Sequence, residues 1–222
     1  MPDLKENVRH VVEVLERESA PFGRVPRLIA VTKYVPAESI LPLRDLGVTD
    51  IGENRVQVLR EKLPLISGKF SVHLIGRLQT NKVKYIMKDV CMIHSADRMD
   101  LCREIDRQAR LRGVRMDVLV EMNITGERQK GGIGEEALAS FVREASLLPG
   151  IRLKGLMTMM PLDAPRAYIF ERFTHMRTLL DRARDTEGGQ EMTELSMGMS
   201  QDYDLAARAG ATMVRVGSAL WT

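Results

Sequence analysis

Lys33 is the residue in this sequence best suited to covalent chemistry. It follows the apolar run 28–32, which has the composition of a buried strand, so we expect its amine at a strand end, facing a sheltered site. A desolvated lysine has a depressed pKa, and its amine can then attack a carbonyl compound to give a Schiff base. A lysine that only extends its charged end to solvent at a strand terminus is the competing interpretation.

A second group of candidates lies near the C-terminus, where small and hydroxyl residues follow two apolar runs: Ser196, Gly198, Ser200, Gly217 and Ser218. Small residues let backbone N–H groups approach a phosphate, and hydroxyls can donate hydrogen bonds to its oxygens. Ser-Gly segments also serve as plain chain reversals. Combined with a reactive lysine, a phosphate site suggests pyridoxal 5′-phosphate (PLP), a cofactor that needs an amine partner and a phosphate anchor.

The elements that must position these residues alternate between strand and helix along the chain. Strands are predicted at 27–33, 48–54, 70–76, 90–96, 115–123, 153–159, 194–200 and 212–219. Helices are predicted at 4–15, 36–47, 55–64, 79–88, 98–112, 138–148, 169–183 and 202–209. The strand runs are almost continuously apolar, as in parallel sheets covered on both faces. Asp3 and Glu6 have the spacing of a capping box for the first helix.

This alternation predicts a (β/α)₈ barrel with an N-terminal helix, formed by residues 1–222 as one domain. A doubly wound open sheet is the alternative, but no G-x-G-x-x-G turn follows the first strand. In a barrel, residues at the C-terminal ends of the strands share one face, where active sites lie. Lys33 and the two C-terminal segments are therefore expected to converge there.

Composition excludes several classes of protein. The 222 residues carry 33 basic and 30 acidic groups, so their near balance gives no electrostatic basis for nucleic-acid binding. No apolar run approaches the roughly 20 residues of a membrane span, and the charged N-terminus is not a secretory signal. Cys91 and Cys102 match no metal pattern and suggest a reducing, cytoplasmic setting. The four histidines lack ligand spacing, so we expect no metal site.

Several segments resemble the pyridoxal phosphate homeostasis proteins, relatives of the alanine racemase N-terminal barrel. The matching segments span nearly the whole chain and include AVTKYVP around Lys33, IGENRVQ (51–57), HLIGRLQTNK (73–82), EMNITGERQKGGI (121–133), GLMTMMP (155–161) and the run from ELSMGMSQDY to VRVGSALW (194–221). SMGMS-x-D-Y and VRVG are specific when they occur together. Four residues depart from the pattern without removing a proposed cofactor contact: Tyr34, Val35, Arg55 and Ser218.

The resemblance implies a set of cofactor-binding residues: Lys33, Asn54, Met157, Ser196, Ser200, Arg215, Gly217 and Ser218. Lys33 would hold the PLP aldehyde as a Schiff base, and Lys82 and Lys130 are the next lysines to consider. Ser200, Gly217 and Ser218 would bind the phosphate, and Arg215 would face the pyridine nitrogen. Asn54 would lie beside the ring, while Met157 and Ser196 would line the pocket. His73, Asn123 and Met199 are further candidate contacts.

The predicted function is PLP storage or delivery in PLP homeostasis, by a monomer that binds PLP and supplies PLP-dependent apo-enzymes. An arginine beside the pyridine nitrogen disfavours its protonation, which weakens the ring as an electron sink. No second base opposite the lysine is identifiable in the sequence. A PLP-dependent amino-acid racemase is the first alternative, and a barrel that binds a phosphorylated metabolite without a Schiff base is the second.

Overall fold

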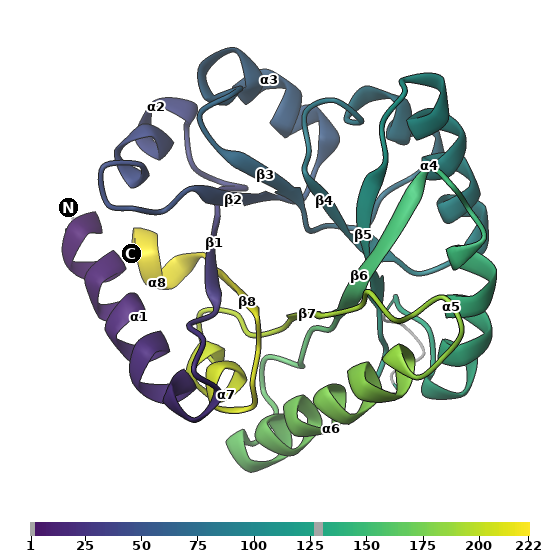
Figure 1. The fold of residues 1–222 in the computed structure, drawn as a ribbon. Coiled ribbons are helices and arrows are strands. Elements are labelled where there is room, and N and C mark those ends of the chain that lie inside the picture. Colours follow the sequence, from purple (N-terminus) through teal and green to yellow (C-terminus); the bar gives the residue numbers. More distant parts are fainter. Residues whose placement is uncertain (1–2, 127–130) are drawn as a thin grey trace.

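Eight parallel strands close into a barrel within residues 3–126 and 131–222, the part of the chain that the computed structural model describes (Figure 1). The strands are β1 (Arg27–Val31), β2 (Asp50–Glu53), β3 (Ser71–Leu74), β4 (Met92–Ala96), β5 (Met116–Glu121), β6 (Ile151–Met157), β7 (Glu194–Ser196) and β8 (Met213–Val216). Each pairs with its neighbour in sequence, and β1 pairs with β8. This closure confirms the predicted (β/α)₈ barrel and excludes the open sheet.

The helices surround the barrel, and most lie where the sequence predicts them. They are α1 (Leu4–Ser19), α2 (Ala37–Ile40), α3 (Val56–Ile66), α4 (Met99–Leu111), α5 (Leu138–Ser146), α6 (Arg166–Arg184), α7 (Tyr203–Arg208) and α8 (Ser218–Trp221), with short 3₁₀ helices η1 (Ala20–Phe22), η2 (Leu41–Leu43), η3 (Thr80–Tyr85) and η4 (Glu135–Ala137). Two predictions were wrong in type. Segment 36–47 is a single α-turn followed by 3₁₀ helix η2, where Pro42 lacks the amide an α-helix needs, and segment 79–88 forms 3₁₀ helix η3.

Asp3 caps α1 as predicted, because its carboxylate accepts hydrogen bonds from the backbone amides of Lys5 and Glu6. The Glu6 carboxylate pairs with Arg9 at 3.1 Å instead of returning to the cap. The capping box is therefore only half formed.

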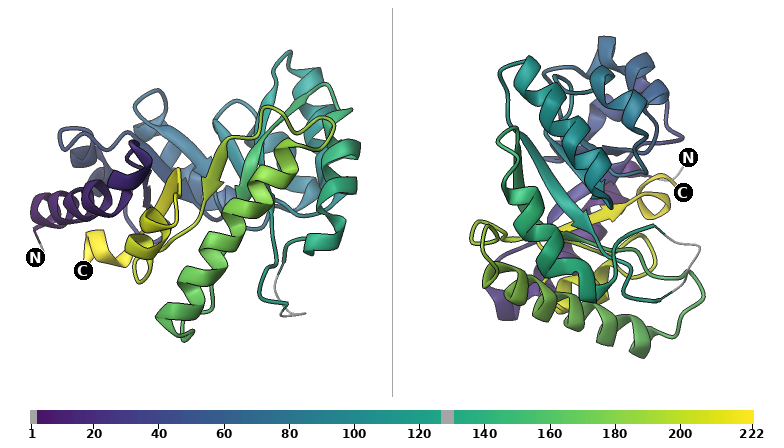
Figure 2. Two further views of the ribbon diagram at one scale, coloured as in Figure 1. Left: turned by 60° about the horizontal axis from the view of Figure 1, so that its bottom comes forward. Right: turned by 90° about the vertical axis from the view of Figure 1, so that its right-hand side faces the viewer.

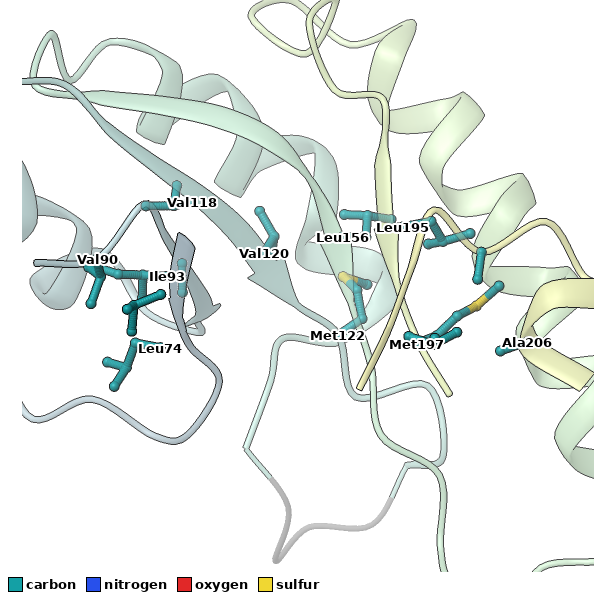
Figure 3. Packing of buried hydrophobic residues seen from close by; sticks show 14 of the residues in the cluster. Leu74, Val90, Ile93, Val118, Val120, Met122, Leu156, Leu195, Met197 and Ala206 are labelled. Atoms are coloured by element: carbon teal, nitrogen blue, oxygen red, sulfur yellow. The ribbon is translucent and has the colours of Figure 1, made fainter. Parts of the chain in front are cut away.

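Apolar packing occurs in two separate layers. The larger layer lies between the strands and the helices, and Figure 3 shows part of it, running from Val120 of β5 past Leu156 of β6 to Leu195 of β7, Met197 and Ala206 of α7. The smaller layer fills the barrel interior and contains Ile29, Met92, Leu119, Met157 and Met213. Burial on both faces explains why the strand runs lack polar alternation.

The two ends of the described chain meet beside the closure of the barrel. α1 and α8 lie side by side in both views of Figure 2, and the Asn7 side-chain amide donates to the Leu220 carbonyl at 3.1 Å. The last turn of the chain is thereby fixed next to β1. In the described ranges 3–126 and 131–222, we find no helix with the length and apolar character needed to cross a membrane.

Candidate functional site

Lys33 lies in the turn after β1, two residues beyond the last strand residue. Its side chain is exposed, which corrects the expectation of a desolvated amine. The Nζ atom lies 5.1 Å from the centroid of the Tyr34 ring, a cation–π distance. Among residues 3–126 and 131–222, no hydrogen-bond or ion-pair partner engages this amine, so it is available to react.

The two C-terminal segments meet at Ser200. Its Oγ accepts hydrogen bonds from the backbone amides of Gly217 at 3.0 Å and Ala219 at 3.3 Å, so the segments after β7 and β8 are joined. The Ser200 hydroxyl proton remains available to a further acceptor. Ser218 is exposed at the start of α8. Gly198 has φ +91°, and a Cβ there would lie 2.5 Å from the Ala206 Cβ, so this turn requires glycine.

Arg215 is buried inside the barrel on β8. One guanidinium nitrogen donates to Ser196 Oγ at 2.6 Å, and the other donates to the Thr158 carbonyl at 2.8 Å. Burial lowers the pKa of Arg215 to about 10, while the charges of Asp202 and Glu121 act in the opposite direction. The positively charged guanidinium of Arg215 is therefore held in place by two hydrogen bonds on β8, the strand that pairs with β1.

Arg215 is one end of a hydrogen-bonded series that we call the histidine chain: Asp50, His73, His94, Ser196 and Arg215. His73 Nε2 lies 2.9 Å from Asp50 Oδ1, His73 Nδ1 lies 2.9 Å from His94 Nε2, and His94 Nδ1 lies 3.0 Å from Ser196 Oγ. Asp50 is the first residue of β2, near Arg27 and Glu194 at the other end of the barrel. The chain thus connects the two ends of the interior.

The protonation of the histidine chain is restricted. Burial, with the charges of His73 and Arg215, holds the pKa of His94 well below its ordinary value, so His94 carries one ring proton. Ser196 accepts from Arg215, and its hydroxyl proton can be donated to His94 Nδ1, which leaves the ring proton of His94 on Nε2, facing His73 Nδ1.

Asp50 contributes the fixed negative charge of this chain. Burial alone would raise its pKa, but hydrogen bonds from His73 and Thr49 and the nearby positive charges lower it overall. Asp50 is therefore ionised at neutral pH, and it faces the cation of Arg27.

Three predicted pocket residues lie deeper than expected. Met157 and Ser196 are completely buried, and His73 is 1% exposed. Met157 packs in the interior apolar cluster, while Ser196 and His73 belong to the histidine chain. All three side chains are therefore enclosed within the barrel interior.

Asn54, Asn123 and Met199 lie at the C-terminal ends of their strands and are partly buried. A Cβ on Gly76 would lie 2.4 Å from the Asn54 carbonyl oxygen, so glycine lets the segment after β3 approach Asn54 closely. Asn123 Oδ1 accepts a hydrogen bond from Thr125 at 3.3 Å, and the Met199 amide donates to Asp202 at 2.6 Å.

Glu121 is a titratable group that our reading of the sequence missed. It ends β5, is 7% exposed and shares its neighbourhood with Asp97: a Cβ built on Gly131 would lie 3.5 Å from a carboxylate oxygen of each. Burial and the charge of Asp97 raise the pKa of Glu121 to about 7. The signal was present, because strand alternation places Glu121 on the same face as the predicted Asn123.

A metal site or a cavity elsewhere in the described residues would be an alternative functional site. No group of three or more His, Cys, Asp or Glu residues in ranges 3–126 and 131–222 could hold a metal ion. A cavity of about 750 Å³ opens near the starts of β5 and β6, where Arg115, Arg143, Ile151 and Glu187 are among its lining residues. None of the predicted site residues lines it. Lys130 lies outside the described residues.

Comparison with known proteins places the chain among PLP-related barrels. The family model described as "Alanine racemase, N-terminal domain" matches residues 3–222. The chain is 38% identical over 97% of its length to the pyridoxal phosphate homeostasis protein of Aquifex aeolicus (strain VF5), covering 96% of that protein. It is 32% identical over its full length to the protein of that name from Pseudomonas aeruginosa, covering 96% of it.

Solved structures agree with these sequence matches. PipY of Synechococcus elongatus PCC7942, solved without PLP, has a TM-score of 0.90 at 30% identity, with 99% of this chain and 100% of PipY covered. PipY with PLP bound has a TM-score of 0.84 at 31% identity, with 94% and 100% covered. Alanine racemase of Clostridium difficile 630 shares only the fold, with a TM-score of 0.79 at 16% identity over 59% of its length. The chain belongs to the alanine racemase N-terminal domain family, and it matches pyridoxal phosphate homeostasis proteins over nearly their full length.

Proposed function

We propose that this protein binds PLP, holds it as a Schiff base on Lys33, and stores or delivers it in PLP homeostasis. The observation that carries the proposal is that three features occur toward one end of the barrel: the Lys33 amine, which has no polar partner among the described residues, the Ser200–Gly217 contact, and the Arg215 guanidinium held by Ser196. The relatives named pyridoxal phosphate homeostasis protein and the PLP-bound PipY structure support it.

The residues at this end of the barrel fit the chemistry of the cofactor. Lys33 supplies a primary amine, and its condensation with an aldehyde forms a C=N bond while both amine protons leave with the carbonyl oxygen as water. Ser200 can donate its hydroxyl proton to a phosphate oxygen, beside the backbone of Gly217 and the exposed Ser218. Asn54 would lie beside the ring, and Met157 and Ser196 would line the pocket from the barrel interior.

Arg215 favours a carrier over an efficient catalyst. Bound PLP supplies an electron sink, whose strength depends on a protonated pyridine nitrogen. A guanidinium facing that nitrogen would oppose protonation, because two adjacent positive charges repel. Arg215 is held by Ser196 and Thr158 and cannot easily turn away.

We further propose that residues 1–222 act as one PLP-binding domain, as a monomer in the cytoplasm, and that the recipients of PLP are PLP-dependent apo-enzymes. Both cysteines, Cys91 and Cys102, are free thiols, which supports a reducing compartment. The proposal includes neither a nucleic-acid nor a membrane partner.

The visible absorption spectrum of the PLP-treated protein tests the proposal. We expect a yellow protein whose absorption band disappears in Lys33→Ala, while the fold is kept because Lys33 is exposed. Lys82→Ala is the matched control and should keep the band. Borohydride reduction should trap PLP on Lys33. A band that survives Lys33→Ala would contradict the assignment and move attention to Lys82 or Lys130.

Glu121 is the observation that keeps the racemase alternative open to test. β5 lies opposite β1 in the barrel, so Glu121 is a carboxyl group on the strand facing that of Lys33. Its pKa of about 7 would suit proton transfer. Rapid exchange of the alanine α-proton with solvent deuterium, abolished by Glu121→Gln, would favour a racemase. Negligible exchange in the wild type is expected for a carrier.

A further inference from the structure

A buried polar cluster lies directly behind Lys33, between the barrel and α3. Lys62 Nζ donates to Glu53 Oε1 at 2.6 Å and to the Thr32 carbonyl at 2.6 Å. The Thr32 hydroxyl donates to the same Glu53 oxygen at 2.6 Å. Thr32 and Glu53 are completely buried, and Lys62 is 7% exposed. We call these three residues the Lys62 cluster.

Packing alone does not account for the Lys62 cluster. Lysine and glutamate are almost never buried unless they are paired, since removing two charges from water costs free energy that an apolar pair of the same size would not. The hydrogen bonding of this pair is also incomplete, because Glu53 Oε2 is buried without a hydrogen bond in the described part of the chain. What the buried pair provides is a charge-assisted hydrogen bond from the Lys62 ammonium to the backbone carbonyl of Thr32.

A second side chain holds the preceding carbonyl. Trp221, in the last turn of the described chain, donates its indole Nε1–H to the Val31 carbonyl at 2.9 Å. The Thr32 amide donates to the Gly52 carbonyl at 3.0 Å, and the Val35 amide donates back to the Thr32 carbonyl at 2.9 Å. The two peptide carbonyls before Lys33 are thus held by side chains that lie far away in the sequence. Trp221 of α8 holds the Val31 carbonyl, and Lys62 of α3 holds the Thr32 carbonyl.

The support and the reacting group lie on different sides of this backbone. The Thr32 side chain is completely buried against Glu53, whereas the Lys33 side chain is exposed. The backbone of the turn is fixed from behind, and the Lys33 amine in front has no polar partner among the described residues. A fixed backbone limits the directions from which the amine can approach an aldehyde carbon.

We propose that Lys62, Glu53 and Trp221 are positioning residues that orient Lys33 for condensation with the cofactor aldehyde. The inference rests on the proposed function and goes beyond it, because it assigns a positioning role to three residues that are not among the proposed cofactor contacts. Orientation of two reacting groups controls rate steeply, and a misplacement of about 1 Å can cost on the order of a hundredfold.

The test compares Lys62→Met with Lys69→Met, an exposed lysine just beyond α3 that serves as the matched control. Apo-protein is mixed with PLP and the absorption band is followed in time. Lys62→Met should slow band formation by roughly ten- to a hundredfold, while Lys69→Met should match the wild type. Trp221→Phe, which keeps the ring and removes the N–H donor, should slow it about three- to tenfold. The Trp221 variant also carries the test if Lys62→Met does not fold.

Two further measurements separate positioning from general damage. Competitive acetylation of Lys33 by acetic anhydride, which needs no fixed approach, should be unchanged in Lys62→Met. Hydrogen exchange of the Val35 amide, which donates to Thr32, should accelerate. A wild-type rate of band formation in both Lys62→Met and Trp221→Phe would overturn the inference, as would an equal loss of acetylation. A band that survives Lys33→Ala would instead overturn the proposed function itself.

Discussion

Ser196→Ala tests whether the histidine chain stabilises the barrel interior. The substitution removes one oxygen atom from a completely buried position and leaves the methylene group in place. That oxygen accepts from Arg215 at 2.6 Å and contacts His94 Nδ1 at 3.0 Å. Its loss leaves a buried guanidinium N–H and a buried ring nitrogen without partners.

The expected cost follows from these two orphaned groups. Each unsatisfied buried group costs about 1–3 kcal/mol, so the loss of partners for two groups should lower the free energy of unfolding by about 2–6 kcal/mol. That is a large share of the total of about 5–15 kcal/mol for a domain. For a chain of this size it corresponds to a fall in Tm of roughly 4–24 °C.

Ser19→Ala is the matched control, measured by urea unfolding and calorimetry of the apo-protein. Ser19 is also buried, at 1% exposure, but within the described residues its hydroxyl has no hydrogen-bond partner. Removing an unpaired buried hydroxyl at the end of α1 should leave stability within about 0.5 kcal/mol or raise it. Equal stabilities of Ser196→Ala and Ser19→Ala would refute the reasoning.

Three other substitutions probe separate parts of the site. Ser200→Ala should weaken PLP retention in dialysis by roughly ten- to a hundredfold and keep the absorption band. The reason is that a hydrogen bond to a charged phosphate contributes about 1.5–3 kcal/mol. Unchanged retention would place the phosphate elsewhere. Glu121 has a folded pKa of about 7 against an ordinary value of 4.5, so its carboxyl group costs stability as pH rises through this interval. Glu121→Gln should therefore raise the free energy of unfolding by up to about 3 kcal/mol at pH 8 and leave it unchanged at pH 4, which urea midpoints at both pH values would check. Gly76→Ala should destabilise the protein and disturb Asn54, because the new Cβ would lie 2.4 Å from the Asn54 carbonyl oxygen; a wild-type Tm would contradict this.

The sequence was informative wherever burial alone determines structure. Residues 115–123 and 153–159 read as strands because their apolar runs are buried on both faces, and β5 and β6 lie there. Alternation along β8 set Arg215 on the opposite side from Val214 and Val216 but did not say which side faces inward; the structure shows that Arg215 does. Segment 79–88 was misjudged because helical periodicity does not distinguish an α-helix from a 3₁₀ helix of six residues.

The polar interior was beyond the reach of sequence patterns. His73 and His94 are 21 residues apart, and their contact depends on the register of β3 against β4, in which His73 lies opposite Met92. No local sequence pattern predicts the register between two strands. The exposure of Lys33 was missed for a related reason: β1 ends at Val31, so the lysine lies in a turn and not in the strand.

Trp221 gives the molecule an intrinsic optical probe. It is the sole tryptophan in the sequence, and its indole nitrogen is bonded to the Val31 carbonyl at 2.9 Å, two residues before Lys33. Indole emission depends on the polarity and hydrogen bonding around the ring, and any nearby group that absorbs in the near ultraviolet quenches it by energy transfer. Loading and release of a coloured ligand at Lys33 can therefore be followed over time by tryptophan fluorescence in the unlabelled protein.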